Sequence, residues 1–228
     1  MTEHTPGSWR SRLTPEYVRS RVADTNEGVL AIAGLAEGLA IATSQSIGAV
    51  VAIAAIAGAV SVAGVKYTEE AAEREVQQDL IREEQRLLEL SPEEEIIELA
   101  DHFRGKGLTP ETARKVAEEL SAADALTAKL ETEYGIHDIM DARRPFTEAL
   151  GSGLFFLLGS LVPVLISILV PRSLVDEFEG VGVVLSLTLT SLILSRLAHT
   201  HVLPTILRSL FIGIAAMVTA ALIGSMVS

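Results

Sequence analysis

The sequence of 228 residues contains no cysteine, which excludes a disulfide framework and any metal site built on thiolates. A metal ion could therefore be bound only through oxygen, nitrogen or thioether ligands. The first residues also lack an apolar segment, so we expect no cleaved secretory signal. The sequence shows no nucleophile paired with a base and no cofactor loop, and we therefore expect neither an enzyme nor a permanently bound cofactor.

Basic residues are few, with 18 Lys and Arg against 30 Asp and Glu, and the net charge is −12. An acidic chain does not provide the basic surface that phosphate binding requires, so we expect no nucleic-acid partner. Carboxylates are the only reactive side chains that cluster in the sequence, and clustered carboxylates favour cations as ligands.

The charge is distributed unevenly along the chain. No charged residue occurs from Gly38 to Val65, whereas 21 of the 30 acidic residues lie between Lys66 and Arg144. Hydrophobic residues make up 49% of the sequence in spite of its acidity. Apolar flanks around one acidic segment are typical of a membrane protein with an inserted soluble domain. We also expect the helix of the second span to continue beyond the membrane into solvent, to about Ser91.

We predict an all-α fold in which five transmembrane helices form a bundle and a helical metal-binding domain is inserted on the cytoplasmic side. The predicted parts are a cytoplasmic leader at 1–26, a hairpin of two spans at 27–66, an acidic helical domain at 67–144 and three further spans at 145–228. Within the last part the apolar segments are 149–170, 180–195 and 209–228, and about 20 apolar residues suffice to cross a bilayer core of about 30 Å.

Three Ser/Thr-Pro pairs predict the beginnings of helices. Thr14-Pro15 opens a leader helix, Ser91-Pro92 opens the second helix of the acidic domain with a capping box, and Thr109-Pro110 opens the third. We expect the third helix to end near Ser121 and a fourth to cover 123–134. In the first span, Gly34 and Gly38 have the spacing that lets membrane helices approach closely, with Gly58 in the second span.

Carboxylates occur at two kinds of position. Glu27 opens the first span and Glu37 lies near its middle, where a carboxylate costs at least about 2.5 kcal/mol and normally faces a cavity, a partner or an ion path. The alternative for Glu37 is a protonated side chain that is hydrogen-bonded within the bundle. In the acidic domain Glu95 and Glu98 share one helix face and Glu84 lies on the neighbouring helix, which fits either a divalent-cation site or ordinary solvated surface.

The positive-inside rule predicts the orientation. Most flanking arginines fall on one side of the five predicted spans, whereas only Arg172 falls on the other. The first group is Arg10, Arg12, Arg19, Arg21, Arg143, Arg144, Arg196 and Arg208. We therefore expect a cytoplasmic N-terminus and acidic domain, an external C-terminus and, without organelle signals, the plasma membrane of a prokaryote.

The order of these parts resembles the vacuolar iron transporter family. The resemblance is carried by Asn26-Glu27-Gly28, by AGAVSVAGVKY at 57–67, by SPEEEIIELADHFRGKGLTPETARKVAEEL at 91–120 and by PFTEALGSGLFFLLGSLVPVL at 145–165. It implies a homodimer that moves Fe²⁺ or Mn²⁺ out of the cytoplasm in exchange for protons. By position it also implies that four carboxylates of the domain bind metal, namely Glu84, Glu95, Glu98 and Glu133. Glu27 corresponds to the family's acidic residue at the start of the first span and is implied as a further metal ligand.

Several positions differ from the family pattern. Val62 stands where the family has a methionine, Lys66 where it has a glutamate, and Leu87 where a further domain carboxylate is expected. Lys129 and Leu130 stand near an expected methionine pair. Glu37 is an additional acid, which would either replace the lost ligand or pair with Lys66. Two functions therefore remain open at this point: a divalent-metal transporter, and a transport-incompetent scaffold or regulator in the membrane that responds to metal.

Overall fold

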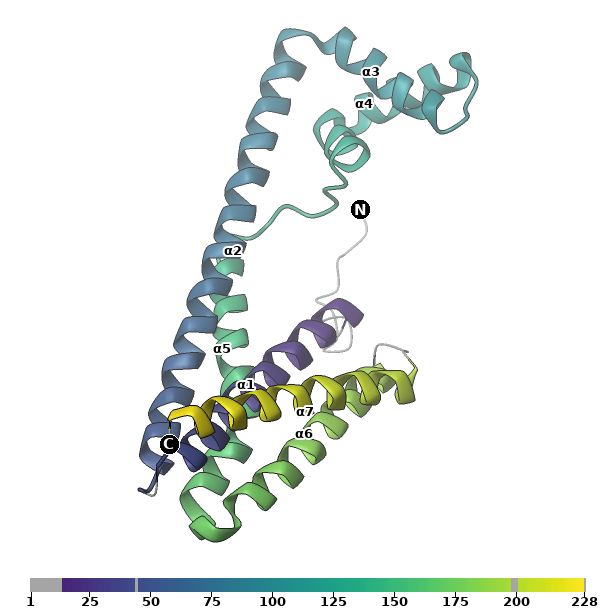
Figure 1. Ribbon diagram of the computed structural model, residues 1–228. Helices are drawn as coiled ribbons and strands as arrows, with labels where there is room; N and C mark the ends of the chain where they lie inside the picture. The colour runs from purple at the N-terminus through teal and green to yellow at the C-terminus, as the bar shows by residue number, and fades with distance from the viewer. Residues whose placement is uncertain (1–13, 44, 198–200, 228) are drawn as a thin grey trace, which may run out of the picture. The chain divides into compact units, whose positions relative to one another are not determined.

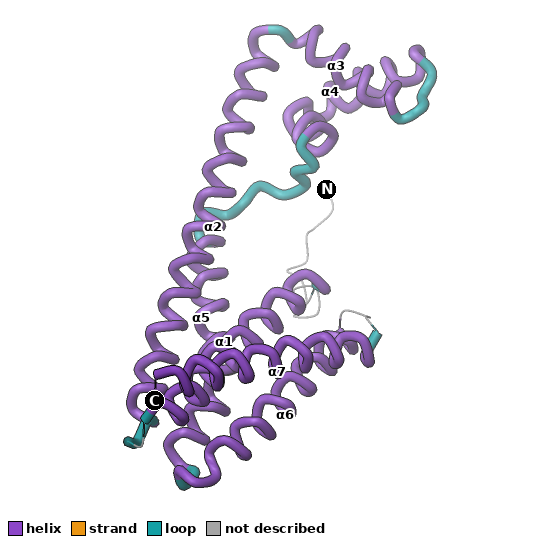
Figure 2. Tube along the Cα trace, viewed as in Figure 1, coloured by secondary structure: helices purple, strands orange, loops and turns teal. Residues whose placement is uncertain are grey.

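The computed structural model describes residues 14–43, 45–197 and 201–227, and these residues form helices and connecting loops without a strand. The helices are α1 (Pro15–Ala42), α2 (Gly48–Leu90), α3 (Pro92–Gly105), α4 (Pro110–Glu133), α5 (Arg144–Leu169), α6 (Val175–Leu197) and α7 (Val202–Val227), with a short 3₁₀ helix η2 (Arg172–Leu174) before α6 (Figures 1 and 2). The predicted all-α fold is confirmed over this part of the chain.

The chain divides into two compact units. One consists of Met1–Tyr67 together with Phe146–Ser228, and the other, which we call the acidic unit, is Thr68–Pro145. The helix α2 is continuous and contributes its first half to the former and its second half to the latter.

Four of the described helices are long and apolar enough to cross a membrane: α2, α5, α6 and α7. The helix α1 is not among them, since its apolar part is interrupted by Glu37 and preceded by charged residues as far as Glu27. The length and composition of these helices make the protein an integral membrane protein. The prediction of five spans stays a prediction.

Two of the three predicted N-cap side chains make the expected hydrogen bond. Thr14 Oγ1 accepts a hydrogen bond from the Tyr17 amide at 3.2 Å, and the leader helix that it opens runs without a break through the first predicted span to Ala42. Thr109 caps α4 in the same way through the Thr112 amide at 3.3 Å. The capping box at Ser91 is wrong: its side chain caps nothing, since its backbone (φ −141°, ψ 56°) lies outside the usual N-cap region, and only its carbonyl accepts bonds from Glu94 and Glu95.

The two helices predicted at 110–134 form one element with a sharp interior break. Asp124 has non-helical backbone angles of φ −161° and ψ 92°. Its carboxylate accepts hydrogen bonds from the Thr127 amide at 3.1 Å and the Thr127 hydroxyl at 2.8 Å. Asp124 therefore serves as the N-cap of a second helical segment, and the predicted break between the two helices is present two residues later than expected.

In the unit formed by 1–67 and 146–228, α1 is the helix against which the others pack. One apolar cluster joins α1, α2 and α5, and it consists of Ile32, Ala36, Ile47, Val51, Ala55, Ala59 and Phe156. A second cluster joins Val29 and Ala33 of α1 to Val183 and Leu187 of α6. Because both clusters include α1, the residues on this helix face protein on more than one side.

Glycines allow the backbone of α1 to touch two of its neighbours. A Cβ at Gly28 would lie 2.0 Å from the Phe156 carbonyl oxygen, and a Cβ at Gly159 would lie 1.9 Å from the Thr25 carbonyl oxygen. The α1–α5 crossing therefore requires glycine on both helices. At the other end of α1, a Cβ at Gly224 of α7 would lie 2.6 Å from the Gly38 carbonyl oxygen, so the close approach predicted for Gly38 is made with α7.

We predict that Gly159→Ala lowers the stability of the folded chain by about 1–3 kcal/mol, because the new methyl group has to push α1 and α5 apart. The measurement is the thermal midpoint of the full chain in detergent. The matched control is Gly64→Ala on α2, where an added Cβ meets no atom within 4 Å. An equal effect of the two substitutions would contradict the tight α1–α5 crossing.

Candidate metal-binding site

Three of the predicted ligands in the acidic unit surround the ammonium group of Lys129. The Lys129 Nζ lies 2.7 Å from Glu95 Oε2 and 2.8 Å from Glu98 Oε2, and it also pairs with Glu133 Oε1. Lys129 is 1% exposed and Glu95 is 6% exposed, whereas Glu98 reaches the surface. The cluster is thus a buried cation bound by carboxylates from two helices.

The local fold explains why these side chains meet. Glu95 and Glu98 are three residues apart on α3, and Lys129 and Glu133 are four residues apart on the second segment of α4, so each pair lies on one helix face. A small apolar cluster of Leu99, Ala100, Ala117 and Ala128 holds α3 against α4. Because Lys129 follows the break at Asp124, the direction of that second segment decides where its ammonium lies.

Glu84 of α2 is the fourth predicted ligand, and it lies at the edge of the same cluster. Tyr134 Oη donates a hydrogen bond to Glu84 Oε1 at 2.8 Å, and Glu84 is 2% exposed. Burial raises the pKa of Glu84, an effect that the Tyr134 hydrogen bond and the charge of Lys129 only partly offset. The same hydrogen bond, together with burial, raises the pKa of Tyr134 to about 12.

The electrostatics of Lys129 follow from two opposing effects. Burial by itself lowers the pKa of the ammonium, but hydrogen bonds to Glu133, Glu95 and Glu98 raise it above the ordinary value for lysine. Lys129 therefore stays positively charged throughout the physiological pH range. Among the residues that the structure describes, no group of three or more His, Asp or Glu side chains is arranged to hold a metal ion. Metal binding by Glu84, Glu95, Glu98 and Glu133 stays a prediction.

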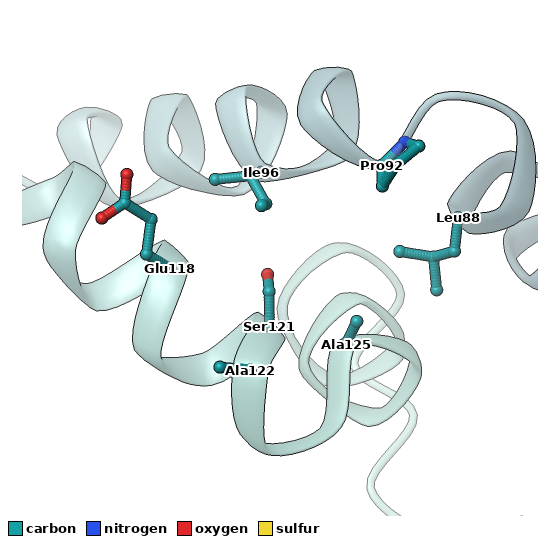
Figure 3. A pocket seen from close by; sticks show the side chains of 7 residues that line it. All are labelled: Leu88, Pro92, Ile96, Glu118, Ser121, Ala122 and Ala125. Atoms are coloured by element: carbon teal, nitrogen blue, oxygen red, sulfur yellow. The ribbon is translucent and has the colours of Figure 1, made fainter.

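An open groove lies between the end of α2, the start of α3 and α4. Its volume is about 320 Å³, and Figure 3 shows the residues that line it: Leu88, Pro92, Ile96, Glu118, Ser121, Ala122 and Ala125. The only carboxylate in the lining is Glu118, which pairs with Arg114 at 2.8 Å. The groove is therefore apolar and does not offer a set of cation ligands.

Glu27 and Glu37, the two predicted ligands of the first span, both lie on α1. Glu27 is exposed and Glu37 is half-buried. A separation of ten residues corresponds to about 15 Å along a helix, so these two carboxylates of one chain do not bind one ion together. Each is a separate carboxylate position on the helix that packs against the most neighbours.

The structure also reveals an ionic cluster at the start of α1 that sequence reasoning missed. Arg21 is 4% exposed; it pairs with Asp24 at 3.0 Å and with Glu148 of α5, and it donates a hydrogen bond to Ser152 Oγ at 3.0 Å. Gly151 leaves room for it, since a Cβ there would lie 2.9 Å from Arg21 Nη1. Arg21 is therefore a buried, ion-paired residue at the contact between α1 and α5.

Two more polar positions lie inside this unit. Glu179 on α6 is fully buried, next to the uncharged segment 180–195. Thr190 of α6 donates a hydrogen bond to Asn26 Oδ1 at 2.6 Å. The Asn26-Glu27-Gly28 motif thus joins α1 to α6 through Asn26 and to α5 through Gly28. A buried carboxylate in an apolar helix, such as Glu179, is a candidate functional residue.

These features define a class: an integral membrane protein of apolar helices that packs around a carboxylate-bearing helix and carries a separate acidic helical unit. The sequence model of the VIT family matches residues 18–225 of this chain. The chain therefore belongs to the VIT family, and the resemblance found in its motifs is confirmed.

A protein named vacuolar iron transporter, from Acanthamoeba castellanii, is 30% identical to this chain over 175 residues. The matched region covers 75% of the chain and 64% of that relative. The chain therefore spans a little under two thirds of the length of this relative, and the two proteins are not equivalent over their full lengths.

We predict that Tyr134→Phe lowers the stability of the acidic unit by about 1–2 kcal/mol at neutral pH, because buried Glu84 loses a hydrogen-bond donor. The pKa of Glu84 is raised in the folded state, so protonated Glu84 favours folding below the ordinary glutamate pKa, and this stabilisation is lost as the pH rises through the raised value. The Tyr134 hydrogen bond favours the ionised carboxylate, so the stability lost in Tyr134→Phe should be smaller at acidic pH, where Glu84 is protonated. The measurement is the thermal midpoint of both chains from acidic to neutral pH.

The matched control for that substitution is Tyr67→Phe, which removes the hydroxyl of a half-exposed tyrosine. A pH-independent loss, or an equal loss in Tyr67→Phe, would contradict the role given to the Glu84–Tyr134 hydrogen bond.

We predict that Arg21→Ala lowers the stability of the folded chain by about 3 kcal/mol, because it leaves Asp24 and Glu148 without their shared cation. Arg19→Ala, two residues away and exposed, is the control and should change the thermal midpoint little. Equal midpoints for the two variants would show that Arg21 is a peripheral charge.

Proposed function

We propose that this protein transports divalent metal ions across a membrane, that its substrates are Fe²⁺ and Mn²⁺, and that it moves them out of the cytoplasm in exchange for protons. The observation that carries the proposal is the VIT family match over residues 18–225. Similarity to a protein named vacuolar iron transporter favours iron as a substrate. A transporter, rather than an enzyme, also fits a chain whose concentrated chemistry consists of carboxylates.

The proposed path follows α1. Carboxylate oxygens suit hard divalent cations such as Mn²⁺, and Glu37 is the half-buried carboxylate in the apolar part of this helix. Val62, which stands in place of the family methionine, packs against the apolar cluster of α1, α2 and α5. With a hydrocarbon at that position, the proposal relies on oxygen ligands from Glu27 and Glu37.

The proposed orientation places the N-terminus and the acidic unit in the cytoplasm. Two of the arginines behind the positive-inside argument, Arg21 and Arg144, are ion-paired with acidic residues. The argument therefore depends mainly on the other arginines on that side, which are Arg10, Arg12, Arg19, Arg143, Arg196 and Arg208. A prokaryotic plasma membrane and a homodimer are parts of the same proposal.

We predict that proteoliposomes containing the purified chain take up Fe²⁺ and Mn²⁺ faster than empty liposomes, and that Glu37→Gln reduces this flux by at least about tenfold because a neutral amide binds divalent cations poorly. Glu119→Gln, at an exposed glutamate of α4, is the control and should leave the flux unchanged. Imposing a pH gradient in either direction tests the proton exchange.

Flux equal to that of empty liposomes for both metals would overturn the proposal. In that case metal binding by the purified chain would be the measurement that distinguishes a metal-responsive scaffold from a protein without a metal ligand.

A further inference from the structure

The acidic unit contains a cation of its own. A lysine ammonium has three N–H donors, and Lys129 has three carboxylate partners: Glu95, Glu98 and Glu133. The donors and the acceptors are therefore matched in number. Lys129 has the largest side chain among the described residues that are less than 2% exposed, and a buried charge of this kind is tolerated only with such compensation.

The oxygens that bind the ammonium are the ones that a divalent ion would need. Two of them lie 2.7 and 2.8 Å from the Lys129 nitrogen, whereas hard divalent cations bind oxygen ligands at about 2.0–2.6 Å. A metal ion in this position would have to displace the ammonium, since two cations about 3 Å apart in a buried site repel each other strongly. The two occupants exclude each other.

We propose that Lys129 is a built-in cation that occupies the carboxylate cluster of the acidic unit in place of a divalent metal ion. The ammonium joins Glu95 and Glu98 of α3 to Glu133 of α4, so the two helices are held together without metal. While the ammonium is in place, the same carboxylates, with Glu84 at their edge, are not arranged to hold a metal ion, and they become available to a divalent cation when the positive charge at position 129 is removed. This inference concerns binding and does not depend on transport by the membrane-spanning helices.

The experiment measures Mn²⁺ binding to the full chain in detergent, with free Mn²⁺ quantified by electron paramagnetic resonance. In the wild-type background, Glu95→Gln is compared with the matched control Glu94→Gln, which changes the exposed neighbouring residue. If Lys129 holds the cluster, both variants bind as much Mn²⁺ as the wild type. A loss of bound Mn²⁺ in Glu95→Gln alone would overturn the proposal.

Neutralising the lysine provides the second arm. Lys129→Gln should bind one more Mn²⁺ per chain than the wild type, with an affinity for this site at least about tenfold higher, because the competing positive charge is gone. Adding Glu95→Gln to that variant should abolish the gain, and Lys129→Arg, which keeps the charge, should behave like the wild type. A folded Lys129→Gln chain without the additional Mn²⁺ would overturn the proposal.

A third measurement applies even if Lys129→Gln does not fold. The thermal midpoint of the wild-type chain is recorded with a chelator and with Mn²⁺, and the same is done for Glu95→Gln. We expect the difference between the midpoints with chelator and with Mn²⁺ to be the same in the wild type and in Glu95→Gln, because Mn²⁺ does not reach the lysine-filled cluster. A Mn²⁺-dependent rise of the wild-type midpoint that disappears in Glu95→Gln would overturn the proposal.

Discussion

The acidic unit depends on the pairing of one buried lysine with three carboxylates. The apolar cluster between α3 and α4 is small, with one leucine and three alanines at its centre and the partly buried Ile96 and Phe103 against it, so burial of hydrocarbon supplies only part of what holds these helices together. Removing charges from water is costly, and the cost is offset only when every donor finds an acceptor. Lys129, with Glu95, Glu98 and Glu133, satisfies that condition, and the packing of α3 against α4 depends on it.

The other unit, which consists of 1–67 and 146–228 and which we call the membrane unit, has few polar side chains in its interior. The polar side chains of α1 join this helix to its neighbours. Arg21 joins α1 to α5 through Glu148 and Ser152, and Asn26 joins α1 to α6 through Thr190. Both residues lie near the beginning of the apolar segment, whereas Glu37 lies well inside it. The polar residues of α1 thus fall into a structural group at one end and a carboxylate further along that is suited to a cation.

Much of the fold could be predicted because its signals are local. Thr14-Pro15 and Thr109-Pro110 mark helix beginnings, and the carboxylates on α3 share a face by spacing alone. The role of Lys129 could not be predicted, since its position opposite Glu95 depends on the break at Asp124 and on α3–α4 packing, which are tertiary features. The burial of Arg21 could not be predicted for a similar reason, because an arginine beside an apolar helix ordinarily reaches the headgroups, and the room left for it by Gly151 is a tertiary feature.

The glycines along α1 have a mechanical consequence. Where Gly28 meets Phe156 and Gly159 meets Thr25, the two helix backbones touch without intervening side chains. Rotating α1 against α5 would bring the larger side chains beside these glycines into a contact that has no room for a Cβ. We therefore expect α1 and α5 to move together in a rearrangement of this unit, carrying Glu27 and Glu37 with them.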